Sequence, residues 1–514
     1  EWVSRYNGTA DVSDFPKKVI ADRFGNVYVG GYTTQGNSSQ DYTIIKYNSN
    51  GIQQWISFYN GNVSGPDYGN SITIDNTGNV YVTGKSLFSG YDIVTVKYNT
   101  DGIQQWAVIY NGPLNGGEEA KSVTVDESGN VYVTGYTLAT SNNIDFITIK
   151  YNSSGVQQWV RIYDGPGHQY DEAKIISTDP SGNIYITGWS FGNGTSYDYC
   201  TIKYNSQGSQ QWVARYNNSY NGIDEANSMA VGNNGNVYVT GVSQGSGTNY
   251  DFATIKYNSA GVSQWVSRYN GTGNFIDRAN SLKIDSIGNV YVTGNSSGVN
   301  LASDYATIKY NAQGVQQWFS GYNGPANDSD VPLDIVLDNS GNIYVTGYSY
   351  STPADEDITT VKYNHNGSQQ WVSRYNHSLN DEGVSMAIDN LNNIYVCGNS
   401  GPGMNADFVT IKYSQPIGIQ MISSEIPEIF FLSQNYPNPF NPNTKIQFAL
   451  PKSSFVKVVV YDVLGKEIET LVNEQLNAGS YEVDWNAADY PSGVYYYKFT
   501  AGNYSETKKM VLNK

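Results

Sequence analysis

The chain has 514 residues, 39% of them hydrophobic, which is enough for large cores and for more than one domain. Its formal net charge is −17 and it has no long run of basic residues. We therefore do not expect a nucleic-acid partner. No apolar stretch reaches the ~20 residues that cross a bilayer, and two cysteines are too few for a disulfide scaffold.

The composition favours β structure with many turns. Tyr (45) and Gly (53) are abundant, and long segments with helical spacing of Ala, Leu, Glu and Lys are absent. The first residues, Trp2 to Tyr6, read as a strand, and near-copies of this strand return along the chain.

A short motif, "GNVYVTG" at 78–84, recurs eight times in steps of 51 or 53 residues. The copies begin at Gly25, Gly78, Gly129, Gly182, Gly235, Gly288, Gly341 and, altered, Asn392. An acid stands eleven residues before each copy, at Asp14, Asp67, Glu118, Asp171, Asp224, Asp277, Asp330 and Asp381. Each unit therefore contains several positions that repeat in register.

We call a position that repeats in register a column. Two further columns follow the motif in each unit. One starts with Asp and has Lys five residues later, at Asp41, Asp92, Asp145, Asp198, Asp251, Asp304, Asp357 and Asp407. The other is the Trp of segments such as "QQWVSRYN", at Trp2, Trp55, Trp106, Trp159, Trp212, Trp265, Trp318 and Trp371. Turn signals rich in Asp, Asn and Gly separate the columns, so each unit reads as a four-stranded antiparallel meander.

A fixed period near 50 residues with four short strands per unit predicts an eight-bladed β-propeller over residues 1–413. The motif repeats because a blade is covered on both faces by its neighbours, so that Val80 and Val82 pack one way and Tyr81 the other. The last unit stops at Tyr413 without a Trp strand of its own. We therefore expect residues 1–9 to complete the last blade as its outer strand.

These units resemble the SBBP family of β-propeller repeats, whose pattern joins an Asp-Gly-Asn turn, a Tyr-Val-Thr-Gly strand and an Asp-x-x-x-x-Lys strand. The resemblance covers residues 1–413 and implies a fold rather than a ligand.

The repeat ends at Tyr413, and residues 414–430, which include Pro416 and Pro427, are predicted to be a linker. Residues 431–514 contain alternating strands such as "VKVVVYDVLGKEI" and "PSGVYYYKF", which suit a small immunoglobulin-like β-sandwich. This segment has eight acids and eight lysines, so the excess negative charge lies in the rest of the chain.

Residues 431–514 closely resemble the type A C-terminal sorting domain of type IX secretion cargo. The motifs that carry the resemblance are, in order, Asn-Pro-Phe-Asn-Pro, Asp-Val-Leu-Gly, Ser-Gly-Val-Tyr and Lys-Lys-x-Val. The resemblance implies export across the outer membrane by the type IX machinery, followed by release or attachment at the cell surface. By analogy its functional residues are Gly493, Val494, Tyr495, Lys508, Lys509 and Val511. An ordinary immunoglobulin-like module is the alternative.

The eight acids that precede the inner strands are the candidate metal site. A ring of such side chains near one mouth of the channel would attract cations such as Ca²⁺, but we favour a structural role, because a group present in every blade more often caps a turn or bonds the next blade. We expect the acid and lysine columns to pair from blade to blade. Cys200 and Cys397 are predicted to be buried thiols that form no disulfide, and the three histidines show no zinc spacing.

The sequence predicts an exported or surface-attached binding or adhesion module for a glycan or protein ligand, with aromatic residues in variable loops such as 88–92 and 192–198. One alternative is a structural subunit that assembles with its own copies into an extracellular layer or fibre and keeps its C-terminal domain. Another is a propeller enzyme with a site at the channel mouth, although no asymmetric cluster of acid, base and nucleophile is visible. We expect no cofactor, and Ca²⁺ at the acidic ring is the alternative.

Overall fold

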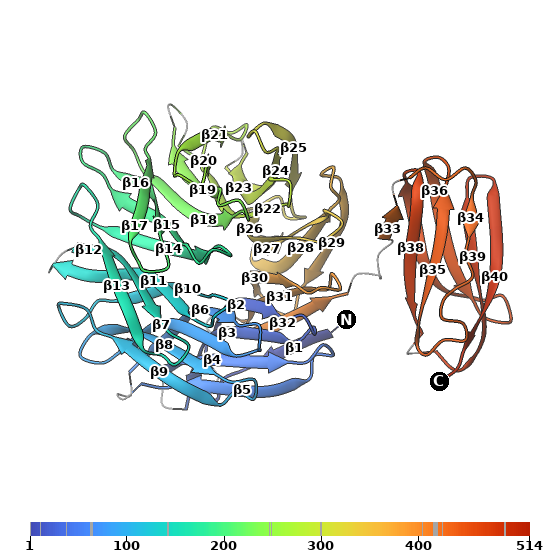
Figure 1. Ribbon diagram of the computed structural model, residues 1–514, viewed down its shortest axis with the longest axis horizontal. Helices are drawn as coiled ribbons and strands as arrows, with labels where there is room; N and C mark the ends of the chain where they lie inside the picture. Colours follow the sequence, from blue (N-terminus) through green and yellow to red (C-terminus); the bar gives the residue numbers. More distant parts are fainter. Residues whose placement is uncertain are drawn as a thin grey trace. The chain divides into compact units, whose positions relative to one another are not determined.

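The computed structural model of the protein is all-β (Figure 1). It describes the chain except residues 1, 11, 37–38, 62–64, 141–142, 246, 248, 299–300, 403–404, 415–419, 424 and 488–489. Within the described residues there is no helix, and hence no helix that could span a membrane. The chain divides into two compact units, Glu1–Tyr413 and Ser414–Lys514, which are described separately.

Six antiparallel sheets of four consecutive strands make up most of the first unit. Their strands are β2 (Phe15–Ala21), β3 (Val27–Gln35), β4 (Ser39–Tyr47) and β5 (Gln53–Tyr59); β6 (Asp67–Ile74), β7 (Val80–Leu87), β8 (Tyr91–Tyr98) and β9 (Gln104–Tyr110); β10 (Glu119–Val125), β11 (Val131–Thr140), β12 (Asn143–Tyr151) and β13 (Gln157–Tyr163); β14 (Asp171–Thr178), β15 (Ile184–Phe191), β16 (Tyr197–Tyr204) and β17 (Gln210–Tyr216); β18 (Asp224–Val231), β19 (Val237–Gln244), β20 (Tyr250–Tyr257) and β21 (Ser263–Tyr269); β22 (Asp277–Ile284), β23 (Val290–Ser297), β24 (Ser303–Tyr310) and β25 (Gln316–Tyr322).

Two more groups of strands complete this unit. The first group is β26 (Val331–Leu337), β27 (Ile343–Thr352), β28 (Asp355–Tyr363) and β29 (Gln369–Tyr375), and the second is β30 (Asn380–Ile388), β31 (Ile394–Gly401) and β32 (Asp407–Tyr413), with β1 (Trp2–Tyr6). The parallel pair Glu356 and Asn380 joins the two groups into one eight-stranded sheet. Strand β1 pairs antiparallel with β32, from Trp2 opposite Lys412 to Tyr6 opposite Phe408.

The repeated motif is explained by its turn and by a close approach of two strands. Gly78 has φ +86° in the turn between β6 and β7, and Asp75 accepts hydrogen bonds there from the backbone N–H of Thr77 and Asn79. At the other end of the motif, a Cβ on Gly84 would lie 1.8 Å from the Tyr68 carbonyl oxygen. Glycine is therefore favoured at the first end of the motif, where Asn392 takes its place in the last copy with φ +61°, and is required at the second end.

The core of the first unit lies between its sheets. Val80 and Val82 are fully buried against Tyr28 and Tyr42 of the preceding sheet, whereas Tyr81 belongs to the core shared with the following sheet. The prediction that alternate residues of "NVYVT" pack in opposite directions is therefore confirmed. A strand covered on both faces needs no polar face, which is why the centre of the motif, Val80 to Val82, is apolar on both faces.

The sheets are arranged around a common centre, with the first strand of each nearest to it (Figure 1). Neighbouring inner strands contact one another, and β2 contacts β30, so the two ends of the series meet. One apolar core contains Val27 and Tyr47 from the first sheet together with Tyr395 and Phe408 from the last group of strands. The prediction of an all-β, propeller-like fold with four-stranded antiparallel blades is confirmed at this level.

The second unit has two four-stranded antiparallel sheets, in the orders β33-β38-β35-β34 and β37-β36-β39-β40. Their bounds are β33 (Gln420–Ser423), β34 (Phe431–Leu432), β35 (Asn443–Leu450), β36 (Ser454–Tyr461), β37 (Glu467–Leu476), β38 (Gly479–Asn486), β39 (Gly493–Ala501) and β40 (Tyr504–Leu512). Side chains from both sheets, such as Phe448 and Phe499, form one core around Trp485.

The predicted linker at 414–430 needs a correction. Residues 420–423 form β33, which pairs with β38 as an edge strand of the second unit. The sequence gives little sign of this strand because it is short and prolines lie on both sides. Pro416 lies outside the described residues, whereas Pro427 is described.

Candidate functional site

The antiparallel order of the strands gives each sheet of the first unit two different ends. Turns such as 22–26 and 48–52, which join the first to the second and the third to the fourth strand, lie at one end, which we call the turn end. The loops between sheets and the connections between the second and third strands lie at the opposite end, called here the loop end. The repeated turns and the variable loops are therefore separated in space.

At the turn end, the Lys and Trp columns attach each sheet to the next. Lys97 lies over the ring of Tyr81 at 5.2 Å and donates to the carbonyl oxygen of Ser153 in the following sheet at 3.3 Å. Trp106 Nε1 donates to the same carbonyl oxygen at 3.2 Å. All eight lysines of the column lie over a Tyr ring in this way: Lys46, Lys97, Lys150, Lys203, Lys256, Lys309, Lys362 and Lys412.

The predicted pairing of the acid column with the lysine column is wrong. The contact does run from sheet to sheet, but the acceptor is a backbone carbonyl oxygen, as for Lys256 with Ala312 at 3.1 Å. The reason is the direction of the strands. Each lysine is at the turn end, whereas the acids begin the inner strands at the loop end, about a strand length away.

The eight acids of the proposed cation ring are buried, with at most 1% of each residue exposed. They accept hydrogen bonds from backbone N–H groups of the loop that leads into their own strand, as Asp277 does from Gly271 at 2.6 Å. Burial raises the pKa of Asp14 and of Asp224 to about 6, although these hydrogen bonds oppose the rise. Such contacts are those of loop caps.

Among the described residues, one group of acids comes close enough to share an ion. It consists of Asp145, Asp164 and Asp171, and only Asp171 belongs to the acid column. The column as a whole is therefore not brought together into a single metal centre. Asp164 was not singled out from the sequence, although a signal was present, because the other seven repeats have Asn at this position.

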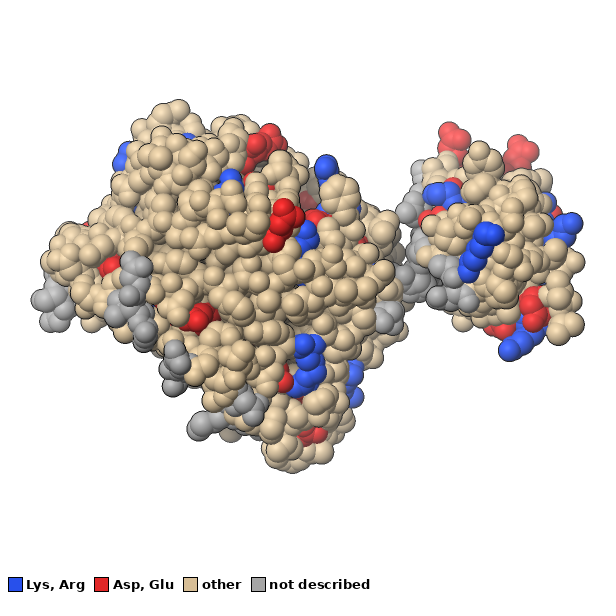
Figure 2. Space-filling view, turned by 90° about the horizontal axis from the view of Figure 1, so that it is seen from below, with Lys and Arg blue, Asp and Glu red and all other residues tan. Residues whose placement is uncertain are grey.

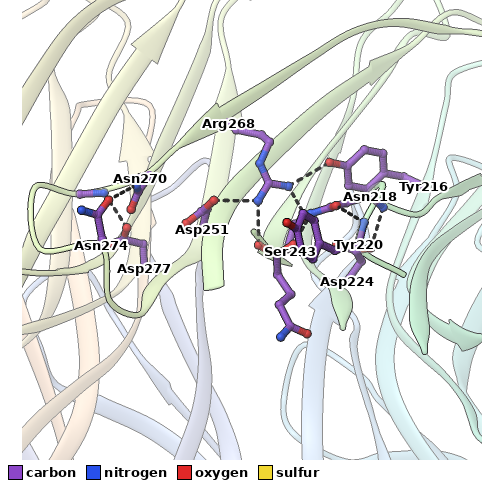
Figure 3. Close-up of polar contacts among 12 residues, drawn as sticks. Tyr216, Asn218, Tyr220, Asp224, Ser243, Asp251, Arg268, Asn270, Asn274 and Asp277 are labelled. Atoms are coloured by element: carbon purple, nitrogen blue, oxygen red, sulfur yellow. Dashed lines mark hydrogen bonds and ion pairs between the residues drawn. The ribbon is translucent and has the colours of Figure 1, made fainter. Parts of the chain in front are cut away.

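The carboxylates of the Asp–Lys column also lie at the loop end of the sheets; six of the eight are buried, whereas Asp304 and Asp407 are partly exposed. In Figure 3, Arg268 binds Asp251 at 2.7 Å and also contacts Ser243 and the Tyr216 hydroxyl group. Arg215 binds Asp198 in the same way, and Arg5 of β1 binds Asp407 of β32. These arginines stand three residues after the repeated Trp.

Other blades have an uncharged residue at the position of this arginine. Phe58 takes its place beside Asp41, and burial raises the pKa of Asp41 to about 6, with a further contribution from Asp67. Ile162 takes its place beside Asp145, whose pKa rises to about 7 through burial and then through the charges of Asp164 and Asp171. The junctions between sheets are thus chemically unequal.

Few charged side chains are present on the face of the first unit shown in Figure 2, and they are scattered. At the loop end, the loops between sheets expose large apolar or aromatic residues, which are Leu114, Tyr170, Tyr220, Phe275 and Leu379. On the outer strands β5 and β9, a surface hollow of ≈ 420 Å³ is lined by Phe58, Tyr59, Asn60, Gln104, Ala107 and Ile109.

The two cysteines are buried and free, as predicted. Burial raises the pKa of Cys200 to about 12 and also raises that of Cys397. His168 lies on the surface, and its Nδ1 is 2.6 Å from Asp164. Neither cysteine is arranged as a reactive nucleophile, because a reactive thiol needs a lowered pKa and access to solvent.

The predicted sorting residues lie on one hairpin of the second unit. Val494 on β39 stands opposite Val511 on β40, and Gly493 stands opposite Leu512. Tyr495 is buried, whereas Lys509 is exposed. The Asn-Pro-Phe segment covers part of the free edge of β40, since Phe440 N–H donates to the Val511 carbonyl oxygen at 2.9 Å and Val511 N–H donates to Asn438 Oδ1 at 3.0 Å.

Together, the sheets around a common centre and the small two-sheet unit define an all-β, propeller-like protein with an additional C-terminal domain. The chain carries SBBP β-propeller repeats, matched at 1–37, 56–92, 105–142, 322–353 and 370–401, and a secretion system C-terminal sorting domain of the type IX kind, matched at 434–513. A β-propeller domain of unknown function also matches residues 25–51. The sorting domain makes this a secreted or cell-surface protein.

Several known proteins are distantly similar to this chain. An uncharacterized WD repeat-containing protein of Acanthamoeba polyphaga mimivirus is 25% identical over 478 residues, which is 75% of this chain and 33% of that protein. The chain thus spans about a third of the length of this relative. PorZ, an essential bacterial surface component of the type-IX secretion system of Porphyromonas gingivalis, is 14% identical with a TM-score of 0.35, covering 96% of this chain and 74% of its own. A puromycin hydrolase is 8% identical with a TM-score of 0.41, covering 76% of this chain and 59% of its own.

Proposed function

We propose that this protein is a binding or adhesion module outside the outer membrane, which recognises an extracellular glycan or protein through the loop end of its propeller. The observation that carries the proposal is the separation of the two ends. The turns at one end are near-copies of one another, whereas the loops at the other differ in sequence from blade to blade. Binding residues are found disproportionately on variable loops held by a rigid scaffold.

The exposed residues of these loops suit such a role. Tyr220 is 55% exposed and Tyr170 is 44% exposed, in loops otherwise rich in Asn, Gly and Ser. Aromatic side chains with polar neighbours supply contact area and hydrogen bonds together, and they are enriched among the residues that dominate binding energy. The excess negative charge of residues 1–430 disfavours a strongly anionic ligand.

We also propose that the propeller has eight blades and that β1 is the outer strand of the eighth. Trp2 supports this, because its Nε1 donates to the Ser49 carbonyl oxygen at 3.1 Å, as Trp265 Nε1 does to that of Ala312. Lys412 donates to the same Ser49 oxygen at 2.9 Å. The contacts between the last strands and the first sheet thus repeat those between successive sheets.

The proposed function is tested by presenting the full chain to arrays of polysaccharides and extracellular proteins. The variants Tyr220→Ala and Phe275→Ala change the loop end, and Ile103→Ala is the matched control, since Ile103 is similarly exposed, at 61%, in a turn of the opposite end. We expect at least one loop variant to weaken binding by about fivefold or more, equivalent to ~1 kcal/mol, and the control to bind normally. No binding to any arrayed ligand, or equal losses at both ends, would argue against the proposal.

One observation favours a structural subunit as a second candidate. The turn end carries exposed aliphatic side chains at equivalent positions, which are Ile52, Ile103, Val156, Val262 and Val315. A repeated apolar rim of this kind could pack against a second copy and support a layer or fibre. Electron microscopy of the purified full chain distinguishes the two candidates, because a binding module gives single particles at concentrations at which a structural subunit assembles.

A further inference from the structure

Three carboxylates converge at the loop end, between the sheet β10–β13 and the sheet β14–β17. Asp145 lies on β12, Asp164 follows β13, and Asp171 begins β14. Each contributes an oxygen atom, and these three oxygen atoms all lie within 4.8 Å of one another. Asp145 is 4% exposed and Asp171 is fully buried, whereas the Asp164 side chain reaches solvent.

The equivalent junctions in other blades are less negative. Between β20 and β22, shown in Figure 3, the corresponding residues are Asp251, Asn270 and Asp277, and Arg268 binds Asp251. The same arrangement occurs with Asp198, Asn217, Asp224 and Arg215 one blade earlier. In the present junction, Ile162 replaces the arginine and Asp164 replaces the asparagine. One positive charge is therefore absent and one negative charge is added.

The loop that carries Asp164 keeps the conformation of its counterparts. In four other blades an Asn side chain contacts a second Asn four residues later, as Asn270 does with Asn274 at 2.7 Å. Here Asp164 contacts His168 at 2.6 Å, and His168 has φ +50° where Asn274 has φ +54°. The substitutions have changed the charge of the junction while the fold of the loop has remained the same.

A buried polar atom without a partner points to a ligand at this place. Asn143 is only 9% exposed, and its Nδ2 donates to Asp145 Oδ1 at 3.0 Å. Its Oδ1 is buried and has no hydrogen-bond partner among the described residues. This oxygen faces away from Asp145, because Nδ2 on the other side of the amide binds that carboxylate. An unsatisfied buried oxygen is unfavourable, and a 180° rotation of the amide would turn it toward Asp145. The rotated orientation becomes favourable once a cation lies between the Asn143 oxygen and the Asp145 carboxylate.

We propose that Asp145, Asp164, Asp171 and the side-chain oxygen of Asn143 bind a calcium ion. All four groups offer oxygen ligands, which Ca²⁺ takes at ~2.3–2.6 Å, so two ligands on opposite sides of the ion are about 4.8 Å apart. Water molecules can complete the six to eight ligands on the exposed side of Asp164. The ion joins two neighbouring sheets and supplies the positive charge that Arg268 and Arg215 supply elsewhere.

The decisive variant restores the sequence of the other repeats. Asp164→Asn with His168→Asn recreates the Asn–Asn contact of four other blades, so this double variant is expected to fold. The matched control, Asn217→Asp with Asn221→His, introduces the same pair into a junction that retains Arg215. Each full-length protein is stripped of metal with a chelator and titrated calorimetrically with CaCl₂, and its melting temperature is measured with and without about 10 mM Ca²⁺.

We expect the natural chain to bind one Ca²⁺ with a Kd of ~10⁻⁴–10⁻³ M, as extracellular modules do, and to melt at a higher temperature when Ca²⁺ is present. The restored variant should bind at least about tenfold more weakly and lose the Ca²⁺-dependent shift, because it lacks one of the carboxylate ligands. The control variant should gain no additional site. The proposal is overturned if the natural chain shows neither binding heat nor a shift, or if the restored variant retains both.

Discussion

Replacing Trp2 with Ala tests how the first strand is attached to the rest of the propeller. The Trp2 ring lies 5.8 Å from the ring of Tyr47 in the first sheet and 6.1 Å from that of Tyr395 in β31, and its Nε1 binds the Ser49 carbonyl oxygen. It also packs on Gly51, where an added Cβ would lie 2.5 Å from the indole. The substitution removes all of these contacts and leaves the backbone pairing with β32 in place.

The magnitude follows from the burial of the ring. Truncation of a fully buried Trp costs about 3–5 kcal/mol of stability, so the loss of a half-buried ring costs about 2 kcal/mol. The lost hydrogen bond adds about 1 kcal/mol. The total is about 3 kcal/mol. An unfolding entropy of ~2.1 cal/mol/K per residue over the unit Glu1–Tyr413 is about 0.9 kcal/mol/K, so the melting temperature should fall by about 3–4 °C.

Differential scanning calorimetry of the full chain measures this change, with Trp265→Ala as the reference and Val3→Ala as the control. Trp265 makes the same kind of contacts between two successive sheets, whereas Val3 is 51% exposed. We expect Trp2→Ala and Trp265→Ala to have similar effects and Val3→Ala to cost less than about 0.5 kcal/mol. If Trp265→Ala lowers the melting temperature and Trp2→Ala does not, the first strand does not complete the propeller.

Three further predictions concern charge and reactivity. Burial raises the pKa of Asp14 and Asp224 to about 6, so the folded state binds protons more tightly than the unfolded state. The stability from these groups is fully present below about pH 4 and is lost as the pH rises through 6, so melting scans between about pH 4 and 7 should show a fall. A propeller that is equally stable across this range would contradict it. Lys256→Met removes the bond to the Ala312 carbonyl oxygen and the contact with a Tyr ring, and should cost about 1–2 kcal/mol in a calorimetric scan. Cys200 and Cys397 should resist a thiol reagent in the native protein and react in denaturant, whereas rapid native labelling of both would show that the interior opens.

Much of the architecture could be predicted from the sequence because it repeats. A strand alternates its side chains with a period of two, and eight copies in register show which positions are buried without any knowledge of the partner, as at Val80 and Tyr81. The motifs of residues 431–514 likewise indicated a sorting domain. The short strand β33 was missed because a few edge residues carry no such pattern.

The partners of the charged residues could not be predicted in the same way. Spacing along a strand shows that Asp41 and Lys46 cannot pair with each other, but it does not show which end of the neighbouring sheet each will meet. The stacking of the sheets places Lys46 against the Thr100 carbonyl oxygen at the turn end, and places Asp67, which begins the next sheet, where its charge acts on Asp41 at the loop end. The repeated charged positions were therefore identified correctly from the sequence, but the predicted pairing of acids with lysines was wrong.

The sequence by itself determined the repeated strands, the β architecture and the export domain, since each of these depends on local patterns that recur or match a known family. Only the tertiary structure decided that Asp145, Asp164 and Asp171 form a cluster. These residues lie on a strand, in a loop and at the start of the next sheet, and they meet because two sheets pack side by side around a common centre. A substitution of one Asn by Asp is inconspicuous in a sequence rich in both, and it acquires chemical meaning only when its neighbours in space are known.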